Sequence, residues 1–172
     1  MKSSIVVLDS FTTSPLQIGE TDPRHPSWEP LSEMGDVTLH PRTSPDQILS
    51  RAGKTPILLT NKVVLTREIL EQLTDLRYIG LMSTGTNAVD LEAASELGIT
   101  VCNVPAYSTP SVAQHSIALL LELAGNLSQQ ASLSRSGEWS SQADFSITAA
   151  PIIELAGKNF GIVGCGEIAQ AA

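Results

Sequence analysis

The stretch Gly161-Ile162-Val163-Gly164-Cys165-Gly166-Glu167-Ile168-Ala169 decides the fold, because it passes from an aliphatic run into a helix through closely spaced glycines. In a nucleotide-binding βαβ unit, Gly164 would make the tight turn and Gly166 would let the main chain approach a pyrophosphate. A small third residue, here Ala169, would let helix and strand pack closely. The first amides of the helix would receive the phosphates. The stretch therefore predicts the beginning of a dinucleotide-binding domain at the end of a 172-residue chain.

Working outward from it, short aliphatic runs recur along the chain, separated by helix-like segments. We expect strands at residues 5–8, 37–39, 57–59, 78–82, 99–101 and 160–163. Ser44, Thr66 and Asp90 stand where helix N-caps would be, and Gly98 stands where the helix after Asp90 should stop. Strands that alternate with helices predict an α/β fold with a parallel sheet and helices on both faces.

A longer helix is expected at residues 109–127, beginning at Thr109-Pro110. Its apolar residues leave only a narrow polar stripe, so most of its surface needs a cover. We expect it to pack between two domains or in a dimer interface.

The composition is that of a globular α/β protein, with 42% hydrophobic and 4% aromatic residues. The formal net charge of −8, with scattered Lys and Arg residues, argues against a nucleic-acid-binding surface. No apolar run is long enough for a signal sequence or a membrane span, and no metal-ligand spacing is present. The two cysteines, Cys102 and Cys165, form no CxxC motif, which favours a reduced, cytoplasmic protein.

Candidate functional residues follow two of the expected strands. Thr84 and Gly85 lie in a small-residue loop after residues 78–82, where backbone amides could bind a substrate carboxylate; the alternative is an ordinary βα turn. Lys62 follows residues 57–59 and could bring a positive charge to an anion, although a surface lysine is more often only solvated. His115 on the long helix has no carboxylate to orient it, which favours a structural role.

Five stretches of the chain form a set of motifs in a fixed order: Thr84-Gly85-Thr86-Asn87-Ala88-Val89-Asp90, Gly98-Ile99-Thr100-Val101, Asn103-Val104-Pro105-Ala106-Tyr107-Ser108-Thr109, Val112-Ala113-Gln114-His115 and Gly161-Ile162-Val163-Gly164-Cys165-Gly166. Taken together, these motifs resemble the D-isomer-specific 2-hydroxyacid dehydrogenases, with the glycerate dehydrogenase or hydroxypyruvate reductase branch as the nearest. The resemblance extends over nearly all 172 residues and is strongest from Tyr78 onward.

The resemblance implies a flavodoxin-like substrate domain at residues 1–103 and the start of an NAD(P)-binding Rossmann domain at residues 104–172. It assigns the substrate carboxylate to the loop of Thr84 and Gly85, with Thr84 also near the cofactor. It assigns the pyrophosphate to Glu167 and Ile168, following Gly164 and Gly166. It also implies a homodimer built around the helix at residues 109–127.

The reaction implied is hydride transfer between a nicotinamide, NAD or NADP, and a small 2-hydroxy or 2-oxo acid. The family's catalytic Arg, Glu and His would lie beyond Ala172, so we expect a C-terminally truncated member that is inactive alone. The residue that selects NAD or NADP would also lie beyond it. The alternative is a non-enzymatic module that binds a small carboxylate or a partner chain.

Overall fold

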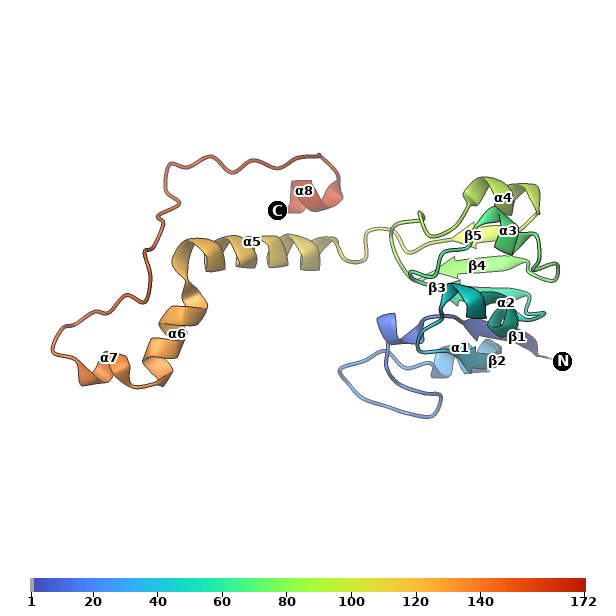
Figure 1. Ribbon diagram of the computed structural model, residues 1–172, viewed down its shortest axis with the longest axis horizontal. Helices are drawn as coiled ribbons and strands as arrows, with labels where there is room; N and C mark the ends of the chain where they lie inside the picture. Colours follow the sequence, from blue (N-terminus) through green and yellow to red (C-terminus); the bar gives the residue numbers. More distant parts are fainter. Residues whose placement is uncertain (1) are drawn as a thin grey trace. The chain divides into compact units, whose positions relative to one another are not determined.

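The computed structural model describes residues 2–172, and the chain divides into two compact units with the boundary between Pro105 and Ala106. The first unit contains one five-stranded sheet (Figure 1). Its strands are β1 (Ser3–Val7), β2 (Gly35–Leu39), β3 (Ile57–Thr60), β4 (Tyr78–Leu81) and β5 (Thr100–Cys102). Each of the first five aliphatic runs therefore forms a strand, with bounds that shift by two residues at most.

All neighbouring strands are parallel, in the order β2-β1-β3-β4-β5. The order reverses direction once, between β2 and β3, as in flavodoxin-like folds. The expectation of an α/β fold with a flavodoxin-like parallel sheet is confirmed. Because the strands are parallel, the loops that follow them all leave from one edge of the sheet.

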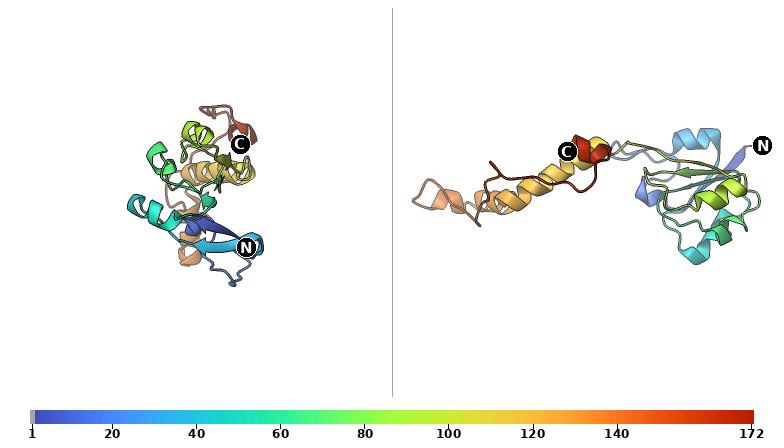
Figure 2. Two further views of the ribbon diagram at one scale, coloured as in Figure 1. Left: turned by 90° about the vertical axis from the view of Figure 1, so that its right-hand side faces the viewer. Right: turned by 90° about the horizontal axis from the view of Figure 1, so that it is seen from above.

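Short helices cover both faces of the sheet: α1 (Glu29–Met34), α2 (Ile48–Ala52), α3 (Arg67–Leu70) and α4 (Leu91–Glu96). Figure 2 shows α1 on one face and the other three on the opposite face. The main core lies under α2, α3 and α4, where Leu58, Leu70 and Ala93 are at most 1% exposed. Trp28 is buried beside α1. This core fixes the register of the strands, because a one-residue slip would expose their buried side chains.

The helix signals differ in how well they match the structure. Asp90 accepts a hydrogen bond from the Ala93 amide at 2.9 Å, and Gly98 has a φ of +69°, which suits a glycine after a helix. The Gln47 side chain accepts a bond from the Ser44 amide at 3.3 Å, as in a capping box. Thr66 precedes α3 without a side-chain cap hydrogen bond.

The second unit consists of α5 (Thr109–Gly125), α6 (Leu127–Arg135), α7 (Glu138–Ser141) and α8 (Glu167–Ala171), joined by irregular segments. The expected long helix is present as α5. Leu119, Leu121 and Leu123 on α5 are 51%, 46% and 76% exposed. No helix within residues 2–172 is long and apolar enough to cross a membrane.

The prediction of a strand at residues 160–163 is wrong for this structure, in which the segment is irregular and Val163 is fully exposed. An isolated strand leaves its amide and carbonyl groups without ladder partners. The second unit, as described, has no other strand with which residues 160–163 could pair. Sequence pattern alone predicts a strand from its side chains and carries no information about that partner.

Candidate substrate and cofactor sites

The carboxyl edge of the sheet brings two predicted substrate-binding segments together. Lys62 follows β3, and Thr84 and Gly85 follow the neighbouring strand β4. Thr60 is paired with Leu81 at the ends of these strands, and the Met82 amide donates to the Thr60 carbonyl at 2.8 Å. The two loops therefore start side by side in the first unit.

The loop after β4 is held by hydrogen bonds that leave several of its amides free, among them those of Thr84 and Gly85. The Ser83 hydroxyl donates to the Gly85 carbonyl at 2.9 Å, which closes the turn. From residues 103 and 104, the Asn103 side chain donates to the Thr84 carbonyl at 2.7 Å and the Thr84 hydroxyl donates to the Val104 carbonyl at 3.1 Å. Within residues 2–172, no group accepts a hydrogen bond from the amides of Thr84 and Gly85. Both amides are available to an external acceptor.

The loop after β3 is different, because a carboxylate of the protein already occupies its amides. Asp9, just after β1, is 4% exposed. Its Oδ1 accepts from the Asn61 amide at 2.8 Å, and its Oδ2 accepts from the amides of Asn61 and Lys62 at 3.1 and 2.7 Å. The Asn61 and Lys62 amides are therefore not available to an external anion, whereas the Lys62 side chain is.

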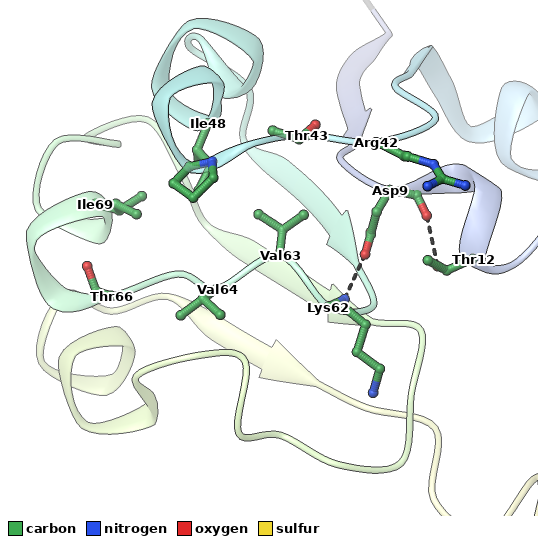
Figure 3. A pocket seen from close by; sticks show the side chains of 11 residues that line it. Asp9, Thr12, Arg42, Thr43, Ile48, Lys62, Val63, Val64, Thr66 and Ile69 are labelled. Carbon is green, nitrogen blue, oxygen red and sulfur yellow. Dashed lines mark hydrogen bonds between the residues drawn. The ribbon is translucent and has the colours of Figure 1, made fainter.

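A groove of about 500 Å³ lies beside these residues (Figure 3). Asp9, Thr12 and Arg42 form its polar end, and aliphatic side chains, among them Ile48 and Ile69, form the other. Of the predicted substrate-binding residues, Lys62 contributes to the groove and Thr84 and Gly85 do not. The sequence analysis missed Asp9, whose only visible signal is that it ends the first aliphatic run.

Positive charge gathers at the polar end of the groove. The Arg42 guanidinium lies over the Phe11 ring, 4.7 Å from its centroid, and forms no ion pair with any described residue. Nearby, burial and then the positive charge of Arg51 lower the pKa of His40, which favours its neutral form. The basic groups at this edge are therefore Arg42, Arg51 and Lys62.

The glycine stretch in the second unit forms a loop and the start of α8. Gly164 has a φ of +110°, a conformation that favours glycine, and Gly166 is the extended residue before α8. A pocket of about 500 Å³ includes Gly164, Gly166 and Ile168, whereas Glu167 is exposed and is not among its lining residues. The first amides of α8 have no partner within the helix, as at any helix start.

Two further expectations concern side chains outside these loops. His115 lies on α5 with an exposed side chain, and its structural role stays a prediction. Within residues 2–172, no three His, Cys, Asp or Glu side chains cluster in a way that could hold a metal ion.

Comparison with known proteins identifies the family. Residues 18–160 match the sequence model of the D-isomer specific 2-hydroxyacid dehydrogenase catalytic domain. The chain is 39% identical over 170 residues to a hydroxypyruvate reductase of Blautia hydrogenotrophica. This alignment covers 97% of this chain and 50% of the relative. It is 34% identical over 128 residues to a glycerate dehydrogenase of Methylorubrum extorquens, covering 74% of this chain and 41% of the relative.

A solved structure has a similar fold. The TT0316 protein of Thermus thermophilus is 26% identical and superimposes with a TM-score of 0.73 over 98% of this chain and 50% of that protein. The chain thus spans about half the length of the relatives it matches. The match of residues 18–160 to the family model and the identity to the two relatives lead to one assignment. The chain belongs to the D-isomer-specific 2-hydroxyacid dehydrogenases.

Proposed function

We propose that the protein containing this chain is an oxidoreductase that transfers a hydride between a nicotinamide cofactor and a small 2-hydroxy or 2-oxo acid. The substrate class is that of glycerate and hydroxypyruvate, as in the names of the two relatives. The cofactor, NAD or NADP, supplies or takes up the hydride at the substrate carbon that bears the hydroxyl or oxo group. The family's Arg, Glu and His would carry the catalysis from outside this chain.

The pair of free amides at Thr84 and Gly85 carries this proposal. A carboxylate binds well to two adjacent backbone N–H groups, and the neighbouring loop holds the Asp9 carboxylate in that way. The loop after β4 has the same kind of donors without an internal acceptor. Its carbonyls are fixed by Asn103 and Val104, so the donors are already ordered before a ligand binds. We assign the substrate carboxylate to this loop, with Thr84 also beside the cofactor and the Lys62 ammonium as a second contact.

The cofactor pyrophosphate is assigned to the stretch from Gly164 to Ile168. The left-handed conformation of Gly164 and the extended Gly166 direct the main chain into α8, so that the first amides of the helix can face an anion. Glu167 contributes through its amide, because its side chain is exposed. Neither NAD nor NADP is favoured by these residues.

Turnover tests the proposal directly. The full-length protein should consume NADH or NADPH with hydroxypyruvate or glyoxylate, and the 172-residue chain alone should not. In the full-length protein, Gly85→Ala places a methyl group beside the free amides, and its Cβ would meet only Asn87 Oδ1, at 3.1 Å. We expect KM for the 2-oxo acid to rise about tenfold. Ser95→Ala, at an exposed position on α4, is the control. Cofactor-dependent turnover by the 172-residue chain would contradict the assignment of catalysis to another segment.

We further propose a homodimer in which residues 109–127 pack against a second copy. The exposed leucines of this helix leave apolar surface in contact with water. Burying that surface against a second copy would stabilise the dimer by about 25 cal/mol per Å². The chain should therefore self-associate in light scattering, whereas a monodisperse monomer at micromolar concentration would contradict this. A purely partner-binding module would show association without turnover by any form of the protein. A cytoplasmic location is proposed from the two free thiols, Cys102 and Cys165.

A further inference from the structure

The Asp9 carboxylate connects the ends of β1 and β3. Val7 is paired with Leu59 in the parallel ladder, so Asp9 stands level with Asn61, just past the last paired residues. There the Asp9 side chain, instead of the main chain of β1, accepts the hydrogen bonds. It accepts three, at 2.7 to 3.1 Å, from the consecutive amides of Asn61 and Lys62. A carboxylate that is only 4% exposed is costly to bury unless such donors compensate it. Asp9 therefore has a defined structural partner, which is the main chain of the loop after β3.

The loop that Asp9 holds is fixed from both sides. The Thr60 hydroxyl accepts from the Val63 amide at 3.2 Å, and the Thr60 carbonyl accepts from the Met82 amide, just after the neighbouring strand β4. The main chain on either side of Lys62 is thus restrained before any ligand is present. Restraint of this kind reduces the entropy lost when a side chain binds.

The side chain of Lys62 leaves this fixed main chain in the direction of solvent. It is exposed and forms no ion pair with any described residue. Figure 3 shows it extending away from Asp9 and from the aliphatic side of the groove. The ammonium is therefore the positively charged donor that this loop still offers to an anion.

We infer that Asp9 is a positioning residue, which fixes the main chain of Asn61 and Lys62 so that the Lys62 ammonium meets the carboxylate of the bound 2-oxo acid. The inference rests on the proposed function. It also gives the two loops different roles. Amides of the loop after β4 bind the substrate carboxylate. The amides of the loop after β3 hold Asp9, so this loop contacts the substrate through the side chain of Lys62. Asp9 itself touches neither substrate nor cofactor.

The experiment measures KM and kcat of the full-length protein with hydroxypyruvate. Asp9→Ala removes the acceptor and should raise KM about tenfold, with kcat changed less than about threefold, because the loss affects binding. Asp9→Asn keeps one acceptor oxygen and should have an intermediate KM. Thr55→Val is the matched control: Thr55 is also 4% exposed and donates to the Ser4 carbonyl at 2.8 Å, at the opposite edge of β1 and β3. It should destabilise the sheet and leave KM unchanged.

The decisive comparison uses Lys62→Gln. If Asp9 acts through Lys62, the effect of Asp9→Ala on KM should disappear when Lys62→Gln is already present. An unchanged KM in Asp9→Ala, or an undiminished effect in the Lys62→Gln background, would overturn the positioning role while turnover by the unmutated protein still supported the proposed function. An unmutated full-length protein without turnover would overturn both.

Discussion

Replacing Gly35 by alanine tests how closely β1 and β2 approach. Gly35 is buried at the start of β2 and is paired with Ser3. A Cβ at this position would clash with the Ser3 carbonyl oxygen and would lie 2.7 Å from Ile5 Cδ1. The φ of Gly35 is −164°, which any residue adopts, so the effect comes from space and not from backbone conformation.

The expected cost follows from these two contacts. Overpacking a close-fitting site costs about 1–3 kcal/mol, and we expect the upper end because a carbonyl cannot rotate away as a side chain can. Alanine also lowers the conformational entropy of the unfolded chain, which offsets the cost by about 0.4–1 kcal/mol. The free energy of unfolding of the first unit should therefore fall by about 2 kcal/mol.

Urea unfolding followed by tryptophan fluorescence measures this change. Trp28, in the first unit, is 7% exposed, whereas Trp139, in the second, is 50% exposed, so a Trp139→Phe background lets Trp28 report alone. In an Ile5→Val background, which lacks Cδ1, Gly35→Ala should cost less, but the contact with the Ser3 oxygen should keep a loss of about 1 kcal/mol. A change below about 0.5 kcal/mol, or a cost that vanishes with Ile5→Val, would refute the reasoning.

Three further outcomes can be checked on the same chain. The pKa of the Asp22 carboxyl, lowered by hydrogen bonds from Arg24 to about 2, should rise towards 3.8 in Arg24→Gln when followed by NMR, so the unmutated pair should break only as the pH falls through about 2. Asp90→Ala should lower the free energy of unfolding by about 1 kcal/mol, because α4 loses its cap; an unchanged urea midpoint would contradict the cap. Burial and then Cys102 raise the pKa of Tyr78, so ultraviolet titration should find a lower pKa for this phenol in Cys102→Ala.

The sheet of the first unit was predictable because its signals are local. Each aliphatic run carries its own pattern, and the spacing of the runs requires crossovers, so a parallel arrangement follows without knowledge of any contact. Asp90 was predictable for the same reason, since an N-cap and its amide are three residues apart. The strand at residues 160–163 failed because strand formation also needs a partner, which is not a local property.

The role of Asp9 could not be predicted from the sequence, because it also depends on a contact that is not local. Its amide partners are 52 and 53 residues away along the chain, and nothing in the sequence near Asn61 indicates that its N–H group is already satisfied. Before the structure, the loops after β3 and β4 were both candidates for anion binding, since both follow parallel strands and contain small or polar residues. The sequence favoured Thr84 and Gly85 over Lys62, but it could not show that the amides after β3 are already occupied.

The two loops differ in what accepts hydrogen bonds from their amides. This difference explains why a buried acidic residue lies at this edge of the sheet. A βα loop presents its amides whether or not a ligand is bound, and unpaired buried amides are costly. After β3 the amides are buried against Asp9, which satisfies them and at the same time excludes a substrate carboxylate by occupancy and by like charge. After β4, Thr84 and Gly85 are exposed, so water can satisfy their amides until an anion displaces it. The amides of Asn61 and Lys62 are thus closed to an external anion and those of Thr84 and Gly85 are open, and this difference depends on a carboxylate that reaches across from β1.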